Sequence, residues 1–489
     1  MLIHYLKKVF PTIKIQWRLQ EGKQHGVIVD TVPEDISLVI LPDSGSNQYE
    51  EHKQLKKRGI DVIVLDHHEC DKESEDAIVV NNQLSPEYEN KTFTGAGIVL
   101  KFLKALDEKL GVNYANYYMD LAAIGNISDL ADQRQSETRY YIYEGLKNIK
   151  NSFLKALLEK QAYSMKNEVA PTGISFYITP LINACVRVGS MEEKENMFKA
   201  FLEENELIYN TRKKESERLE TAMARILTNL KSKQNRIRDK GVAAIEERVK
   251  DKNLLDNKIL IVNTTDILDK NLSGLVANQL CKLYKRPVLL LRQKDDTNVF
   301  GGSARGYEKG AIKDLKQFLN DTEKFIYCEG HGNAFGVEIE GEKLIEVNEL
   351  INDKLKDIEI DMDVHEVDFV IPAKQLKESF IKELYGYRNI WGQKVEEPLL
   401  AIKEVSVNKE DMQLIGKNKN TIKFTYRGIE FVKFFSNEDT YNDIISKGEN
   451  LVFDVVGKAS MNIYEGKETA QIAIEDFEVV KVKKKEFIF

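Results

Sequence analysis

Short apolar runs alternate with charged, helix-compatible segments over the first hundred residues of the chain. Four of the apolar runs have the composition of β-strands, and they lie at 27–31, 37–41, 61–65 and 77–80. Between the second and the third run, residues 50–57 are charged and compatible with a helix. This alternation predicts a parallel α/β sheet.

Ionisable side chains follow two of these predicted strands. Asp66, His67 and His68 lie at the end of the third run, and Asp43 lies on a turn containing glycine and serine after the second. Ligands of open α/β sheets bind at the carboxyl ends of the strands, so we expect Asp43 and His67 to share one edge. The alternative is that both segments are ordinary solvated loops, because clusters this short also arise by chance.

Helical patterns dominate the next hundred residues. Apolar residues recur at helical spacing from Gly95 to Leu110, and a further helix near 117–124 leads towards Asp129. Taken alone, Asp129 is most simply a helix cap. Residues 140–190 are also apolar and helical in pattern.

A change of composition at about residue 191 predicts a connector followed by a second α/β unit. Charged residues dominate 191–238 without proline, which indicates one or two long exposed helices. Forty helical residues would span roughly 60 Å, enough to bridge two domains. Beyond them, strands are predicted at 258–263 and 287–291, with a helix at 272–284 between them.

Two glycine clusters occur in this second unit. Residues 300–306 form the first and include Arg305, and a strand predicted at 325–328 leads into the second, which contains Gly330 and His331. Glycine lets backbone amides approach an anion closely, with Arg305 and His331 as side-chain partners. Ordinary turn chemistry is the alternative for each cluster.

The sequence pattern of the C-terminal part of the chain predicts a β-barrel. Its predicted strands lie at 399–407, 421–426, 431–435, 450–456 and 470–479. This number of strands in about 110 residues suits an OB-fold, which often binds single-stranded nucleic acids.

Length and composition narrow the classes of protein. A chain of 489 residues predicts roughly three domains. No apolar run approaches the ~18–20 residues of a membrane span and no signal peptide is recognisable, so we expect a cytoplasmic protein without a membrane partner. The net charge of −8 argues against non-specific coating of nucleic acid but is compatible with a local basic groove.

The cysteines lie far apart without a Cys-x-x-Cys pair, which predicts buried or incidental thiols rather than a zinc knuckle or a disulfide framework. They are Cys70, Cys185, Cys281 and Cys328.

An ordered set of motifs runs through the chain. Its members are Asp43, Asp66-His67-His68, Gly95-Ala96-Gly97, Asp129, Asn183-Ala184 with Arg187, Gly302-Ser303-Ala304-Arg305, Gly330-His331, Trp391-Gly392-Gln393 and Glu397-Pro398-Leu399. This set resembles the DHH phosphoesterase superfamily, and from about residue 25 to 480 the chain resembles its RecJ branch, the single-strand-specific 5′ to 3′ DNA exonucleases. The resemblance implies a DHH domain at 1–190, a helical connector at 191–240, a DHH-associated domain at 241–365 and an OB-fold domain at 366–489.

The resemblance also implies a divalent-metal site. Carboxylates with an imidazole suit manganese or magnesium better than zinc in a chain without thiolate clusters. By the family's pattern Asp43 bridges two metals, His67 and Asp129 complete one of them, and Asp66 and His68 orient ligands or contact the scissile phosphate. Contacts to the substrate phosphates are implied for Asn183, Arg187, Gly302, Ser303, Arg305, Gly330 and His331.

Two departures from the family's pattern stand out. The family carries an earlier Asp-x-Asp signature that holds the second metal, and this chain has no such motif. Val186 stands where the family usually has glycine. Three explanations fit the first departure: the missing strand belongs to another polypeptide, the site works with one metal or borrowed ligands, or the protein is a weak relative kept for binding.

The sequence therefore predicts a metal-dependent 5′ to 3′ exonuclease of single-stranded DNA that works with DNA-repair or replication proteins. One rival is a phosphodiesterase for short oligonucleotides or cyclic dinucleotides. The predicted barrel argues against this rival, because a dinucleotide needs no extended platform for a strand. The other rival is a DNA-binding scaffold with a vestigial metal site.

Overall fold

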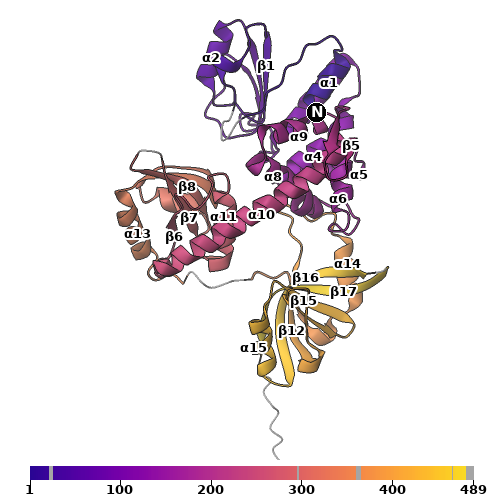
Figure 1. The fold of residues 1–489 in the computed structure, drawn as a ribbon, viewed down its shortest axis with the longest axis vertical. Helices are drawn as coiled ribbons and strands as arrows, with labels where there is room; N and C mark the ends of the chain where they lie inside the picture. Colours follow the sequence, from indigo (N-terminus) through magenta and orange to yellow (C-terminus); the bar gives the residue numbers. More distant parts are fainter. Residues whose placement is uncertain (21–25, 295–296, 360–364, 465, 481–489) are drawn as a thin grey trace, which may run out of the picture. The chain divides into compact units, whose positions relative to one another are not determined.

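The computed structural model shows a parallel sheet, a long helix, a second sheet and a C-terminal mixed sheet in that order along the chain (Figure 1). The chain divides into two compact units, each described separately below. Unit 1 comprises 1–182, 190–227 and 367–489, and unit 2 comprises 183–189 and 228–366. The structure describes residues 1–20, 26–294, 297–359, 365–464 and 466–480.

Unit 1 begins with a parallel three-stranded sheet in the order β1-β2-β3. Its strands are β1 (Leu38–Pro42), β2 (Asp61–Asp66) and β3 (Ile78–Asn81). The strand predicted at 27–31 is wrong, because Val29–Thr31 form a 3₁₀ turn. The Thr31 hydroxyl and amide both donate to the Ile28 carbonyl, which closes a turn in place of a strand.

Helices α2 (Tyr49–Lys57) and α3 (Gly95–Leu110) pack against this sheet. The remaining helices of this region are, in sequence order, α1 (Leu2–Val9), α4 (Met119–Ser128), α5 (Ser136–Lys147), α6 (Ser152–Gln161), α7 (Pro171–Gly173), α8 (Thr179–Val188) and α9 (Met191–Phe201). The predicted helix at Gly95–Leu110 is confirmed. It begins where the Thr94 side chain caps the Gly97 amide and ends at Gly111, whose φ of 66° is a left-handed helix stop.

The charged segment after α9 is not continuously helical. A short hairpin of β4 (Leu207–Asn210) and β5 (Glu215–Arg218) precedes α10 (Leu219–Asp251), a helix of 33 residues. The Asn210 side chain accepts hydrogen bonds from the Arg212 and Lys213 amides and forms the hairpin turn. The prediction of helices throughout 191–238 is therefore wrong at the hairpin and confirmed for the long helix.

Unit 2 contains a five-stranded sheet in the order β6-β7-β8-β10-β9, in which only the β6–β7 pair is parallel. Its elements are β6 (Leu260–Asn263), α11 (Ser273–Tyr284), β7 (Val288–Gln293), β8 (Val299–Arg305), α12 (Leu315–Asn320), β9 (Phe325–His331), β10 (Ala334–Glu340) and α13 (Lys343–Lys354). The glycine cluster at 300–306, for which turn chemistry was the alternative interpretation, lies in strand β8 up to Arg305. Gly302 is required there because a Cβ atom would lie 1.9 Å from the Leu290 carbonyl oxygen of β7.

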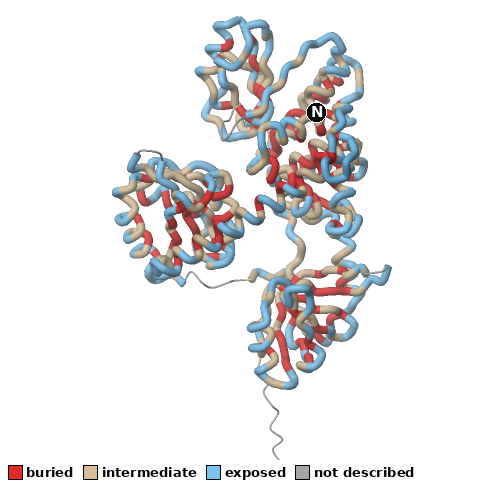
Figure 2. The backbone as a smooth tube through the Cα atoms, viewed as in Figure 1, coloured by how far each residue is buried: buried red, intermediate tan, exposed pale blue. Residues whose placement is uncertain are grey.

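The C-terminal part of unit 1 is a seven-stranded mixed sheet that contains the five predicted strands and two that were not predicted, β11 and β13. Its elements are β11 (Phe369–Pro372), α14 (Glu378–Gly386), β12 (Leu399–Asn408), β13 (Gln413–Ile415), β14 (Thr421–Tyr426), β15 (Ile429–Phe434), α15 (Glu438–Ser446), β16 (Asn450–Tyr464) and β17 (Lys467–Val479). Phe424 stacks on Phe431 and on Phe453 in its core, with ring centroids 5.1 and 5.2 Å apart. Figure 2 shows buried residues along the interior of the larger sheets and of the helices packed on them. Among the described residues no helix is long and apolar enough to cross a bilayer.

A polar cluster around Glu137 ties helix α5 to helix α3 and to the loop between β3 and α3. The Glu137 carboxylate accepts hydrogen bonds from the Tyr88 hydroxyl, from Lys101 Nζ at 2.5 Å and from Asn90 Nδ2 at 3.3 Å. Burial alone would raise the pKa of Glu137, but these donors outweigh burial and lower the pKa below its usual value. The charged form of Glu137 therefore stabilises the folded state.

Replacing Glu137 with glutamine is expected to lower the free energy of unfolding by about 1–3 kcal/mol at pH 7. Because the folded pKa lies below the unfolded one, the stabilisation is present above the unfolded pKa and is lost as the pH falls through the folded pKa. Urea denaturation at several pH values would check this. The E144Q variant on the same helix is the control, since Glu144 forms only a surface pair with Lys147 at 3.7 Å. An equal effect of both variants at pH 7 would contradict the expectation.

Candidate metal centre

The carboxyl ends of β1 and β2 present the first two side chains of the site. Asp43 follows β1 with a φ of 61°, a left-handed conformation that aspartate adopts more readily than most residues. The Asp43 amide donates to the Leu65 carbonyl at 2.8 Å, which fixes this turn against β2. His67 follows the last residue of β2 directly.

Three side chains from different elements converge at this edge. His67 Nε2 lies 3.2 Å from Asp43 Oδ1 and 3.2 Å from Asp129 Oδ2, and Asp129 is the C-cap residue directly after α4. The two carboxylates are largely exposed, at 63% and 55% of their side-chain surface, whereas the His67 side chain is only 17% exposed. At this edge, two solvent-accessible carboxylates therefore lie beside one largely buried imidazole.

Asp66 lies beneath this edge and is 1% exposed. Its Oδ2 accepts from the Ser46 amide at 3.1 Å and hydroxyl at 2.8 Å, and its Oδ1 accepts from the His67 amide at 2.8 Å and from His68 Nδ1 at 2.7 Å. Burial opposes ionisation, but the hydrogen bonds from His68 and Ser46 hold the pKa of Asp66 well below its usual range. The hydrogen bond between His68 Nδ1 and Asp66 also raises the pKa of His68. The hydrogen bonds of Asp66 fix the position of the histidine loop.

Two amide side chains that the sequence reasoning missed complete the support of this loop. Asn81 Nδ2, at the end of β3, donates to the His68 carbonyl at 2.9 Å and to the Ser46 hydroxyl at 2.8 Å. Gln83 Nε2 donates to the His67 carbonyl at 3.1 Å. The available signal was their position, because the carboxyl end of β3 lies next to the carboxyl end of β2 in a parallel sheet.

Helix α3 fixes the other two members of the site. The Thr94 hydroxyl at its start donates to Asn126 Oδ1 at 3.1 Å, which holds the end of α4 and therefore Asp129. Gly95 lies directly against Asp43, because a Cβ atom on Gly95 would lie 2.2 Å from Asp43 Oδ1. Gly95 is thus needed for the observed position of the Asp43 carboxylate.

The Gly95→Ala variant is expected to displace the Asp43 carboxylate and lower any activity of this edge by about 10–100-fold, with the fold retained. Turnover and the far-ultraviolet circular dichroism spectrum would be measured together. Gly386→Ala is the matched control, since a Cβ atom at Gly386 would meet nothing within 4 Å. Full activity of Gly95→Ala would contradict the role of this close approach.

The donor set suits a hard divalent cation. One donor atom from each of Asp43, Asp66, His67 and His68 lies within 4.8 Å of the others. Oxygen donors with an imidazole favour Mn²⁺ or Mg²⁺. Because Asp66 Oδ1 and Oδ2 are occupied by hydrogen bonds, the atoms best placed to hold an ion are those of Asp43, His67 and Asp129.

Several residues predicted to contact phosphate lie in unit 2. Burial lowers the pKa of Arg305 and the nearby positive charge of Arg187 lowers it further, which places the two guanidinium groups near each other. Desolvation lowers the pKa of Arg187 as well, although its side chain keeps solvent access. The Ser303 hydroxyl lies 2.8 Å from that of Ser273, at the start of α11. Two like charges brought together in this way favour an anion.

The other predicted phosphate contacts are placed as follows. Asn183 lies on α8, Gly302 lies within β8, and Gly330 lies in β9 with a φ of 129°. Gly330 approaches β10 so closely that a Cβ atom would lie 2.9 Å from the Phe335 Cα. The His331 side chain lies outside the described residues.

Two family models match the chain. The N-terminal domain of the DHH family matches residues 1–126, and the RecJ OB domain matches residues 367–476. Both matched segments lie in unit 1.

Several relatives cover most of the chain, among them two proteins of Bacillus subtilis. A protein of Bacillus subtilis (strain 168) named as a prophage-derived single-strand DNA-specific exonuclease is 49% identical, over 100% of this chain and 86% of its own length. The single-stranded-DNA-specific exonuclease RecJ of the same strain is 25% identical over 90% of this chain and 54% of its own length.

Crystal structures show the same fold. RecJ of Thermus thermophilus in complex with Mn²⁺ superposes with a TM-score of 0.69 over 91% of this chain at 20% identity. The same protein in complex with Mg²⁺ gives a TM-score of 0.64. The chain covers 62% of those crystallised chains.

Proposed function

Since this chain belongs to the RecJ-like branch of the DHH family, we propose that it hydrolyses phosphodiester bonds of single-stranded DNA with the help of a divalent metal ion. The proposal extends to attack from the 5′ end and to work alongside DNA-repair or replication proteins. The observation that carries it is the convergence of Asp43 and Asp129 on His67 Nε2, at 3.2 Å each.

The proposed division of roles follows the geometry. Asp43, His67 and Asp129 would hold the ion, which could be Mn²⁺ or Mg²⁺. A bound divalent ion makes water nucleophilic near neutral pH and neutralises charge on the phosphoryl oxygens. Asp66 positions the loop through its buried hydrogen bonds, and His68, with its raised pKa, can offer positive charge to the phosphate.

The substrate phosphates would be bound mainly by unit 2. Arg187 and Arg305 supply paired positive charge for the strand, and guanidinium groups bind phosphate oxygens in a bidentate manner. Asn183, Gly302, Ser303, Gly330 and His331 remain proposed contacts of the same kind.

A long strand is favoured over a dinucleotide as substrate. The match of residues 367–476 to the RecJ OB domain supports this choice, since OB-folds bind several nucleotides of a single strand. A dinucleotide would need no such platform.

Digestion of labelled strands tests the proposal. The protein would be freed of metal with a chelator, and single strands carrying a label at the 5′ or the 3′ end would be incubated with Mn²⁺, Mg²⁺ or no metal. We expect metal-dependent release of the 5′ label first, with a duplex of the same sequence resistant. Digestion without metal, or release of the 3′ label first, would contradict the respective part of the proposal.

A further inference from the structure

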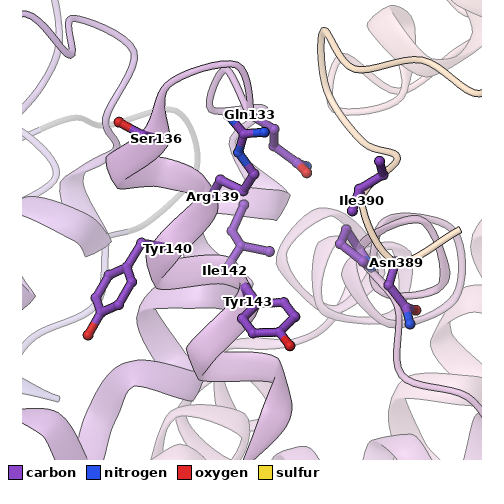
Figure 3. Close-up of a pocket in the computed structure, with 9 residues that line it drawn as sticks. Gln133, Ser136, Arg139, Tyr140, Ile142, Tyr143, Asn389 and Ile390 are labelled. Atoms are coloured by element: carbon purple, nitrogen blue, oxygen red, sulfur yellow. The ribbon is translucent and has the colours of Figure 1, made fainter. Parts of the chain in front are cut away.

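A pocket of about 320 Å³ lies within unit 1, between helix α5 and the segment that follows α14 (Figure 3). Tyr140, Ile142 and Tyr143 of α5 line one side, and Asn389 and Ile390 line the facing side. Its volume is at the small end of the ~300–1,000 Å³ range of ligand pockets, which suits a single nucleotide.

The two tyrosines of this pocket are not required by the core. Tyr140 and Tyr143 are three residues apart on one helix face and are 55% and 56% exposed. The tyrosine of this helix that packs in the core is Tyr141, which is 7% exposed and contacts Phe93 at a ring-centroid distance of 5.5 Å. The buried side chain of Ile142 contributes an apolar surface to the same pocket.

Positive charge accompanies the rings. Lys104 Nζ lies 6.0 Å from the centroid of the Tyr140 ring, and Lys147 Nζ lies 5.5 Å from that of Tyr143. Arg139 lines the same pocket, and its Nη2 donates to the Arg134 carbonyl at 3.3 Å. Across the described ranges no ion pair to a carboxylate involves Arg139, so its charge is available for an anion.

Rings with nearby cations and amide groups match one kind of ligand. Sequence-tolerant sites for single strands combine aromatic platforms, on which bases stack, with Lys and Arg that follow the phosphates. The amide of Asn389, which is exposed at the rim, can donate to and accept from a base edge. A peptide would also fill an apolar pocket, but the charge and the planar rings favour a nucleotide.

The pocket is joined to the candidate metal centre through a short stretch of chain. Asp129 directly follows α4, and Gln133, four residues later, lines the pocket. The backbone N–H of Gln133 donates to the backbone carbonyl of Gln393 at 3.1 Å. This hydrogen bond fixes the segment leading into the C-terminal sheet against the start of α5. The pocket is therefore connected by short stretches of chain to both the metal centre and the segment that leads into the C-terminal sheet.

We propose that this pocket is a base-stacking subsite for single-stranded DNA, formed by Tyr140 and Tyr143 with Arg139 on a strand phosphate. The subsite rests on the proposed function and adds to it a binding position away from the metal ligands. It holds one nucleotide of the strand outside the reacting bond.

Binding without turnover tests the subsite. A 3′-fluorescein-labelled 20-nucleotide thymidine strand would be titrated with the full chain in EDTA and followed by fluorescence anisotropy. The double variant Tyr140→Ala/Tyr143→Ala is expected to raise Kd by about tenfold or more. The ring-preserving variant Tyr140→Phe/Tyr143→Phe is expected to restore binding. Tyr163→Ala is the matched control, since Tyr163 is 96% exposed and lies outside the pocket.

Abasic strands separate stacking from a general loss of structure. A single abasic site moved along the strand should weaken binding of the parent protein by about tenfold at one or two positions, and the double alanine variant should lose this dependence. Equal Kd values for parent and double variant would overturn the subsite and leave the pocket to another occupant, such as a protein segment. No strand binding or digestion by the parent would instead overturn the proposed function, and the subsite with it.

Discussion

Replacing His67 with alanine is expected to lower the rate of metal-dependent strand hydrolysis by about 10³-fold while leaving the fold intact. The imidazole lies 3.2 Å from both Asp43 and Asp129, so its loss removes a nitrogen ligand and the group on which two exposed carboxylates converge. Single-turnover hydrolysis of a 5′-labelled strand in Mn²⁺ measures the rate. Calorimetric titration with Mn²⁺ alone should show weakened metal binding in the same variant.

The control for this experiment is Glu69→Ala in the same loop. Glu69 is exposed, and its backbone carbonyl, which the substitution leaves in place, accepts from Asn47 Nδ2 at 3.0 Å. We expect this variant to retain the rate and the Mn²⁺ affinity of the parent. Strand binding in EDTA by His67→Ala should also match the parent, because stacking and phosphate contacts do not need the imidazole. An unchanged rate in His67→Ala would contradict the metal role of this edge.

The local pattern of the sequence was sufficient to predict three strands of the sheet and the edge at which Asp43 and His67 meet. The strands β2 and β3 end at the polar residues Asp66 and Asn81, Asp43 directly follows β1, and a parallel sheet aligns those ends at one edge. The expectation that Asp43 and His67 share this edge agrees with the 3.2 Å distance between them. Their role as ligands stays a prediction.

Features that depend on contacts between distant segments could not be predicted in the same way. Asn81 and Gln83 support the histidine loop through side-chain hydrogen bonds that span 13 and 16 residues, and no short motif encodes such partners. Strand β8 was not predicted because glycine normally indicates a turn, whereas Gly302 is needed for the close approach of β7. The pocket beside α5 exists only once the segment after α14 packs there.

Removing the buried carboxylate with Asp66→Ala is expected to destabilise the parallel sheet by about 3–5 kcal/mol. Without it, the Ser46 hydroxyl and the amides of Ser46, His67 and His68 lose their acceptor within a buried site, and they cannot all reach water. Hydrolysis should fall as well, because the loop that carries His67 is no longer held.

Native-state hydrogen exchange gives the local measure of this effect. Amides of β1 to β3 that open together should exchange at least about 100-fold faster, since 1.36 kcal/mol corresponds to tenfold. Asp61→Ala is the matched control on the same strand: Asp61 is exposed, and its pair with Lys56 at 2.9 Å is a surface pair worth at most about 1 kcal/mol. Because the amides of the C-terminal sheet belong to a separate core, they should exchange at the parent rate in both variants. Equal protection of β1 to β3 in Asp66→Ala and Asp61→Ala would show that the buried hydrogen bonds of Asp66 do not hold this edge together.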